Sequence, residues 1–324
     1  MNIEELRTRA RISTLFTASE DSGIMLSIQT AAITLLGFSL GMLSGPRIAM
    51  SAQPKPVAQP KPTAQPEPTA APLENGKATT TLPKAAATAL ETGNALAAQG
   101  QFAAAISAYT EAIRVNPKDA RAYYNRGVCQ QRIGELVKTI ADCTEAIRLN
   151  PKYGEAYQTR GFTHRRLSEL DQALADYTQA IQLNPKQAES YLDRGFIYRK
   201  LREFDKALAD CAEAVKLDPK HPVAYNLRGR VYFDEQELDK AIGEFTQALR
   251  CDPKYAEPYY RRGLAYERKG DLDKAITDYT EVIRLEPQNA QAYTQRGFAY
   301  ESKGDKAKAE EDFARAKQLV QKQN

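Results

Sequence analysis

The chain has 324 residues, 42% of them hydrophobic and 27% charged, so it carries enough apolar surface for a folded core. Its 45 basic and 41 acidic side chains leave a net charge of +4, which lacks the strong basicity expected of a nucleic-acid-binding protein. Two histidines, and four cysteines without a C-x-x-C pair, offer few groups for a metal site or for catalysis. We expect no catalytic residue, metal or other cofactor, and neither nucleic acid nor a small-molecule substrate as a partner.

Residues 1–23 form a polar N-terminal tail, and an apolar stretch without charges follows it. Residues 24–43 would make a helix of about 30 Å, close to the thickness of a bilayer core. Three interpretations stay open: a retained transmembrane anchor, the core of a signal peptide cleaved near Ala49-Met50-Ser51, or an apolar tail without a membrane role. The first two predict membrane anchoring or export, and we expect a bacterial periplasm or cell envelope as the location.

Residues 44–85 are predicted to be a proline-rich, disordered linker. Within it, residues 53–74 place prolines at nearly alternate positions over several stretches. Proline lacks an amide donor and fixes φ, which favours an extended polyproline II chain without a core. At about 3.1 Å per residue, this segment would span roughly 70 Å. We interpret it as a spacer, with a ligand for a proline-recognition domain as the alternative.

From residue 86 to residue 323 the sequence repeats with a period of 34 and no insertion. Glycine occupies position 8 of all seven periods, alanine occupies position 20 of six, and proline occupies position 32 of six. Thr139 is the exception at position 20. The predicted repeats are 86–119, 120–153, 154–187, 188–221, 222–255, 256–289 and 290–323.

This pattern resembles the tetratricopeptide repeat (TPR) family, whose 34-residue unit has a large residue at position 4 and an aromatic residue at position 24. In the fifth repeat, positions 4, 8, 11, 20, 24, 27 and 32 are Tyr225, Gly229, Tyr232, Ala241, Phe245, Ala248 and Pro253. The resemblance implies an all-α fold, a right-handed α-α superhelix or TPR solenoid of seven helix-turn-helix repeats. It also implies a non-catalytic scaffold for protein–protein interaction.

The spacing of the small residues supports this fold independently. Positions 4, 8 and 11 share one helical stripe, and positions 17, 20, 21, 24, 27 and 28 share a stripe on a second helix. Glycine and alanine remove bulk where the two helices meet, and a larger residue would cost about 1–3 kcal/mol in overpacking. One hairpin cannot bury both of its faces, so the repeats must stack. Lys306 and Glu310 give the last helix a polar outer side, as a terminal cap requires.

Six repeats combine arginine at position 7 with an acidic residue at position 23, whereas the first repeat has Thr92 and Ala108 there. The joint presence and joint absence predict helix-to-helix ion pairs, either within or between repeats. A ladder of arginines that binds an anionic ligand is the weaker alternative. The predicted pairs are Arg126 with Asp142, Arg160 with Asp176, Arg194 with Asp210, Arg228 with Glu244, Arg262 with Asp278 and Arg296 with Asp312.

The family resemblance also implies where a partner binds. The inner groove of TPR proteins is formed by the first helix of each repeat, on a stripe that lies about 140° from the core stripe. Aromatic and arginine side chains on such a face are typical of binding hot spots. We expect an extended peptide with apolar and acidic residues, while the alternative that these aromatics only seal adjacent helices stays open. The predicted groove residues are Tyr124, Asn125, Arg132, Phe162, Arg166, Phe196, Arg199, Lys200, Arg230, Phe233, Tyr260, Arg261, Arg268 and Phe298, with Arg165 among the interleaved cations and Glu155, Glu189 and Glu257 along one edge.

Some TPR proteins clamp the carboxyl-terminal peptide of heat-shock chaperones. Asn94 and Asn125 occupy two places of that clamp, but Leu90, Glu155 and Thr159 occupy the three cationic places, so this role is not expected. Two other functions remain as alternatives. The first is an accessory or regulatory subunit of an enzyme or of a secretion or assembly complex. The second, less favoured, is RNA binding by helical repeats.

Overall fold

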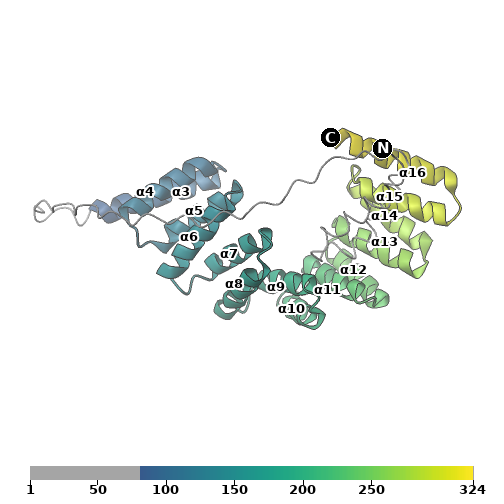
Figure 1. Ribbon diagram of the computed structural model, residues 1–324, viewed down its shortest axis with the longest axis horizontal. Coiled ribbons are helices and arrows are strands. Elements are labelled where there is room, and N and C mark those ends of the chain that lie inside the picture. The colour runs from purple at the N-terminus through teal and green to yellow at the C-terminus, as the bar shows by residue number, and fades with distance from the viewer. Residues whose placement is uncertain (1–80, 324) are drawn as a thin grey trace, which may run out of the picture. The chain divides into compact units, whose positions relative to one another are not determined.

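The computed structural model describes residues 81–323, and over this range the chain folds into helices joined by turns (Figure 1). Consecutive helices pair into seven hairpins, each with an odd-numbered first helix and an even-numbered second helix. The helices are α3 (Thr81–Ala98), α4 (Phe102–Val115), α5 (Ala120–Arg132), α6 (Leu136–Leu149), α7 (Gly154–Arg166), α8 (Leu170–Leu183), α9 (Ala188–Lys200), α10 (Phe204–Leu217), α11 (Pro222–Asp234), α12 (Leu238–Cys251), α13 (Ala256–Lys269), α14 (Leu272–Leu285), α15 (Ala290–Ser302) and α16 (Lys306–Gln323).

The seven hairpins confirm the predicted number of repeats and the all-α solenoid. Helix α3 begins at Thr81, so the last residues of the predicted linker 44–85 are helical. The tail 1–23, the apolar segment 24–43 and the rest of the linker lie outside the described residues. Between residues 81 and 323, no helix combines the length and the apolar character needed to cross a bilayer.

The two helices of a hairpin approach each other most closely at the glycine of position 8. A Cβ atom on Gly229 would lie 2.7 Å from Cε1 of Phe245, and one on Gly263 would lie 2.7 Å from Cε1 of Tyr279. Both rings are fully buried and have no room to move away. At Gly127 the opposing residue is Cys143, whose Sγ would be 3.5 Å away. The aromatic ring at position 24 therefore makes glycine necessary at position 8.

The alanine of position 20 contributes to the same contact and is fully buried in the described hairpins that carry it. Thr139, the exception, is also fully buried. Its Oγ1 donates to the carbonyl oxygen of Gly127 at 3.2 Å and lies 3.1 Å from that of Glu135. A buried hydroxyl is costly unless it is hydrogen-bonded, and here the facing backbone satisfies it.

The turns repeat as regularly as the helices. Position 15, within each hairpin, has a positive φ in all seven repeats, although Ser168, Arg202 and Gln236 replace the glycine of the other four. At the five junctions from α4 to α13, an Asn or Asp ends the second helix and its side chain accepts from the backbone two residues later, whereas Glu286 ends α14. Asp252 Oδ1 accepts from the Lys254 amide at 2.9 Å in this way, and the intervening proline prevents the helix from continuing.

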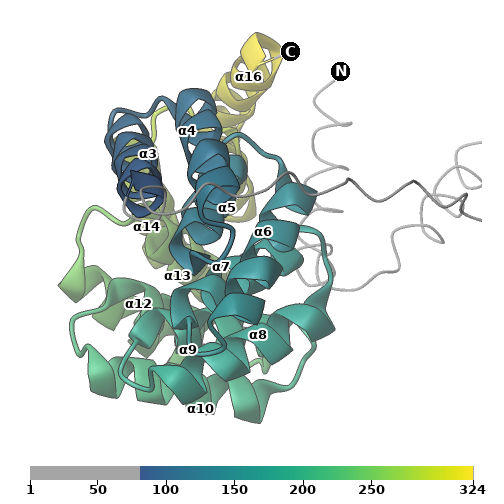
Figure 2. The same cartoon turned by 90° about the vertical axis from the view of Figure 1, so that its left-hand side faces the viewer.

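Neighbouring hairpins pack side by side, second helix against the following first helix (Figures 1 and 2). A buried cluster around Phe245, Leu264 and Tyr279 joins residues from α11 to α15. First helices also touch the first helices of the adjacent hairpins, from α5 to α13. We call the side of the array that these first helices line the inner face.

The predicted arginine–carboxylate pairs form within each hairpin. Arg194 binds Asp210 through two hydrogen bonds, Nη2 to Oδ1 at 2.7 Å and Nε to Oδ2 at 2.9 Å. Its remaining Nη1 donates to Thr178 Oγ1 of the preceding hairpin at 3.3 Å, and its guanidinium lies over the Tyr191 ring. The ion pair therefore joins the two helices of one hairpin and also links that hairpin to its neighbour. The same arrangement occurs at Arg126–Asp142, Arg160–Asp176, Arg262–Asp278 and Arg296–Asp312. Arg228 Nη2 lies 2.8 Å from Glu244 Oε2, but its Nε has no hydrogen-bond partner within residues 81–323.

The packing at position 8 predicts unequal effects of one substitution in two repeats. Gly229→Ala should lower the free energy of unfolding by about 1–3 kcal/mol, because the added methyl group overlaps the buried Phe245 ring. Gly127→Ala should cost less, because the nearest atom to its methyl group would be Asp142 Cβ at 3.3 Å and alanine favours a helix by about 1 kcal/mol. Urea unfolding followed by far-ultraviolet circular dichroism measures both. Equal losses at the two positions would show that the ring does not impose the glycine.

A double-mutant cycle tests the ion pair. Arg194→Leu should cost about 3 kcal/mol, because it leaves the Asp210 carboxylate, 6% exposed, without its partner. Adding Asp210→Ala should recover part of this loss, with a coupling energy between about 0.5 and 3 kcal/mol. The measurement is the unfolding free energy of the two single variants and of the double variant. Simple additivity would mean that the pair contributes nothing as a pair.

Candidate peptide-binding site

The middle of the inner face gathers arginine and phenylalanine side chains from α7, α9 and α11. Phe196 lies at the centre, and four cations surround its ring. The ring centroid is 5.0 Å from the Arg165 guanidinium carbon, 5.7 Å from that of Arg199, 5.9 Å from that of Arg230 and 5.5 Å from Lys200 Nζ. Cation–π contacts contribute about 0.5–2 kcal/mol each, depending on exposure. We call the group of Phe162, Arg165, Phe196, Arg199, Lys200 and Arg230 the arginine–phenylalanine cluster.

Carboxylates beside the cluster neutralise part of its charge. Arg165 Nη2 lies 3.6 Å from Asp193 Oδ1, which is longer than a hydrogen bond. Arg199 Nη1 donates to Asp234 Oδ2 at 2.5 Å. These groups come from three consecutive first helices, α7, α9 and α11, so the pairing also holds neighbouring hairpins together.

A third carboxylate is shared by two arginines. Glu257 Oε1 accepts from Arg230 Nη1 at 3.1 Å and lies 3.5 Å from Arg261 Nε. Burial, and then the positive charges of Arg199 and Arg261, lower the pKa of Arg230 to about 10. An arginine pKa falls only where positive charge is poorly solvated and incompletely balanced. Arg230 is therefore a buried cation beside two other arginines, with Glu257 and Asp234 offsetting part of their charge.

Two guanidinium groups of the cluster keep unused donors. The Nε atoms of Arg165 and Arg230 are buried and have no hydrogen-bond partner within residues 81–323. The two side chains as a whole are 24% and 19% exposed. A buried donor without a partner costs about 1–3 kcal/mol, so the arrangement is costly for the fold itself.

Two further groove residues extend the cluster toward the C-terminal hairpins. The guanidinium of Arg268 lies 4.0 Å from the centroid of the Phe233 ring, and Phe233 is 7% exposed. Burial lowers the pKa of Arg268, and Asp234 and Glu267 offset part of that effect. Phe233 belongs to the buried cluster of α11 to α15, so it seals adjacent helices while Arg268 covers it.

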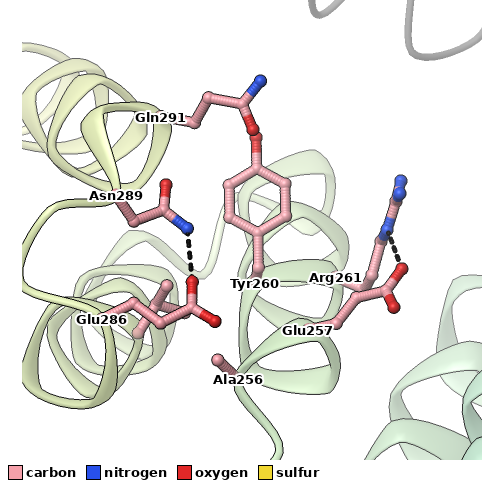
Figure 3. A pocket seen from close by; sticks show the side chains of 8 residues that line it. Ala256, Glu257, Tyr260, Arg261, Glu286, Asn289 and Gln291 are labelled. Atoms are coloured by element: carbon pink, nitrogen blue, oxygen red, sulfur yellow. Dashed lines mark hydrogen bonds and ion pairs between the residues drawn. The ribbon is translucent and has the colours of Figure 1, made fainter. Parts of the chain in front are cut away.

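A hollow of about 180 Å³ lies between α13, the end of α14 and the start of α15 (Figure 3). Tyr260 projects from α13 into this hollow, and the side chain of Gln291 reaches toward its hydroxyl end. Asn289 Nδ2 donates to Glu286 Oε2 at 2.8 Å on the opposite wall. The hollow is lined by Ala256, Glu257, Tyr260, Arg261, Val282, Glu286, Asn289 and Gln291. Because Glu257 accepts a hydrogen bond from Arg230, the hollow adjoins the arginine–phenylalanine cluster.

The remaining predicted groove residues lie apart from the cluster. Tyr124 packs against Tyr153 with ring centroids 4.8 Å apart, and Asn125 Nδ2 donates to Asn94 Oδ1 at 2.9 Å. Arg132 and Arg166 are exposed at the ends of α5 and α7.

Phe298 is 9% exposed and packs edge-to-face on Phe313 of its own hairpin, at 5.1 Å between centroids. It therefore belongs to the core of the last hairpin. The places of the chaperone-peptide clamp are also used internally, since Leu90 is buried and Asn94 bonds Asn125.

The sequence did not single out Asp193 or Asp234, the acids that pair with Arg165 and Arg199. Both lie on first helices, close in sequence to predicted groove residues. An acidic residue in such a place could have been predicted to pair with a groove arginine. The cysteines have structural positions: all four are free, and burial raises the pKa of the Cys143 and Cys211 thiols to about 12. In the part of the chain that the structure describes, no group of three or more His, Cys, Asp and Glu is placed to hold a metal ion.

Comparison with known families agrees with the geometry. A family model described as TPR repeat matches residues 93–134, 163–201, 229–270 and 268–304. Models described as tetratricopeptide repeat match residues 120–153, 188–221 and 290–319. Together these matches cover most of the helical array, and the chain belongs to the tetratricopeptide repeat family.

Solved structures share the fold at low sequence identity. A tetratricopeptide repeat protein from Parabacteroides merdae superposes with a TM-score of 0.61 at 22% identity, covering 73% of this chain and 93% of that one. The pilF protein of Pseudomonas aeruginosa superposes with a TM-score of 0.57 at 15% identity, covering 66% of this chain and 97% of that one.

Similar curated proteins match over a short segment only. Hsp70-Hsp90 organizing protein 1 of Glycine max is 49% identical over 51 residues, and the Hsp70-Hsp90 organizing protein of Triticum aestivum is 47% identical over 51 residues. Each match covers 16% of this chain and 9% of the relative. The similarity therefore concerns the repeat unit and does not extend over the whole of either relative.

Proposed function

We propose that the chain is a non-catalytic scaffold that binds an extended segment of a partner protein along the inner face of its first helices. Membership of the TPR family supports a role in protein interaction. The observation that carries the proposal is the arginine–phenylalanine cluster, where cations from three consecutive first helices meet at one ring. Arginine and aromatic side chains at the centre of a contact surface are the types that dominate binding energy.

The contacts of His164 support the non-catalytic part of this proposal. His164 Nδ1 lies 2.5 Å from Glu169 Oε2, and its Nε2 lies 3.8 Å from Asp176 Oδ2. Asp176 is itself held by Arg160. The histidine is thus part of an ion-pair network between α7 and α8, and that network explains its position without a reaction.

We further propose that residues 24–43 place the scaffold at or beyond a membrane, in a bacterial periplasm or cell envelope. The support is the uncharged, apolar composition of this segment, whose length matches a bilayer core, followed by a proline-rich spacer. Such a spacer would keep the binding array away from the bilayer surface.

The binding role is tested with the full-length chain on an array of immobilised peptides of varied sequence. Phe196→Ala should weaken binding of the captured peptides by about ten- to thirtyfold, the effect of losing a central aromatic anchor. Arg148→Ala is the matched control, because Arg148 is 66% exposed on the second helix α6. If both variants bind like the wild type, the inner face is not the binding surface, and co-purification with one stoichiometric enzyme would instead favour an accessory subunit.

The membrane role is tested by fractionating cells that make the full-length chain and by sequencing the amino terminus of the mature protein. A retained anchor predicts an intact amino terminus in the membrane fraction, and a cleaved signal predicts a new terminus close to residue 51. Deleting residues 24–43 should leave the protein soluble inside the cell in either case. An intact wild-type chain in the soluble cytoplasmic fraction would disprove membrane targeting.

A further inference from the structure

We infer that the arginine–phenylalanine cluster binds a carboxylate of an acidic peptide segment, with Arg230 as its principal contact and Arg165 beside it. This inference rests on the proposed peptide-binding function and names the chemistry of the ligand. It concerns side chains of α7, α9, α11 and the start of α13, none of which is one of the clamp positions Leu90, Asn94, Asn125, Glu155 and Thr159.

The first argument is charge balance. Three arginines (Arg165, Arg230 and Arg261) share two carboxylates (Asp193 and Glu257) in the ion pairs beside Phe196. Glu257 serves two arginines at once. A ligand carboxylate would add negative charge beside Glu257, the carboxylate that Arg230 and Arg261 share.

The second argument is the geometry of the donors. Arg230 makes one hydrogen bond to Glu257 at 3.1 Å, and its Nε is buried without a partner. Arg165 has an unpartnered Nε as well, and its contact with Asp193 is 3.6 Å long. Both guanidinium groups contact the ring of Phe196, so they belong to the same small patch. Guanidinium forks bind carboxylates through paired hydrogen bonds, which this patch is able to offer.

The third argument separates a carboxylate from other anions. Asp193, Asp234 and Glu257 lie among the arginines, and a doubly charged phosphate would meet more repulsion from them than a single carboxylate would. The rings of Phe162 and Phe196 adjoin the cations and offer apolar contact to neighbouring residues of the same ligand. A peptide with an acidic residue next to apolar residues fits both features.

Glu257 behaves in this arrangement as an internal competitor for the ligand. It holds the hydrogen bond from Arg230 that a peptide carboxylate would take. Removing its charge should therefore favour acidic ligands, and removing Arg230 should disfavour them. Replacing Arg230 should disturb the fold little, because Glu257 keeps Arg261 as an ion-pair partner.

The experiment uses the full-length chain and pairs of synthetic peptides that differ only in Glu against Gln, taken from the immobilised array. Arg230→Gln should weaken binding of the Glu peptides about tenfold more than it weakens binding of the matching Gln peptides. Glu257→Gln should strengthen binding of the Glu peptides several-fold. Arg148→Gln, on the outer helix α6, is the matched control, and circular dichroism confirms that each variant is folded. Peptides ending in a free acid or an amide tell a terminal carboxylate from a side-chain one.

Opposite shifts from the two variants support the inference, because a general loss of packing would weaken binding in both. Equal affinity of the wild type for Glu and Gln peptides would overturn the carboxylate site and leave the peptide-binding function intact. Failure of the wild type to bind any peptide on the array would overturn both proposals together.

Discussion

The close contact between the glycine of a first helix and the aromatic ring of its second helix determines how each hairpin is built. At Gly93, Gly229, Gly263 and Gly297 a Cβ atom would stand less than 3 Å from the facing ring. The helices therefore lie as near to each other as their backbones permit, and the ring fills the space that remains. Where cysteine replaces the ring, as at Cys143, the nearest atom to an added Cβ is Asp142 Cβ at 3.3 Å, so the hairpin stays tightly packed. The same hairpin geometry, repeated, puts every first helix on the inner face.

Two sets of arginines with different environments result from this geometry. The arginines of position 7, such as Arg194, point along the helix-to-helix contact and satisfy their donors with an acid of the same hairpin and a threonine of the previous one. Those on the inner face, such as Arg230, share their carboxylates and keep donors unused. A structural role accounts for the first set, although Arg228 also keeps a buried Nε without a hydrogen-bond partner within residues 81–323. The second set adds cost to the fold, and a cost of this kind is expected where a surface is built for a ligand.

Most of the fold was predictable from the sequence because the residues of one helix-to-helix contact recur in seven repeats. Glycine at position 8, alanine at position 20 and proline at position 32 mark the contact and the turns directly. The arginine–acid pairs were predictable for the same reason, since both members are present or absent together. The bond from Arg194 to Thr178 was not predicted, although threonine recurs at position 25 in five repeats and accepts from the arginine of the following repeat each time.

The candidate site was less predictable, since side chains on the inner face do not repeat. Periodicity assigned Phe233 and Phe298 to the groove by position alone, yet both are buried because the neighbouring helix covers them. The pairing of Arg199 with Asp234 spans two hairpins and depends on how tightly α9 and α11 approach, which a single repeat does not encode. Likewise, Ser168, Arg202 and Gln236 adopt the left-handed turn that glycine adopts elsewhere, because the packed helices on both sides impose it.

Stacking is the remaining condition, since a hairpin that buries one face against itself must bury the other against a neighbour. Helices near the middle of the array have neighbours on both sides, whereas α3 and α16 belong to the two end hairpins. Native-state hydrogen exchange of the full-length chain measures this dependence directly, segment by segment. The account predicts that amides of α8 to α13 exchange most slowly and those of α3 and α16 fastest. Rapid exchange throughout the central hairpins, or equal protection of every hairpin, would contradict it.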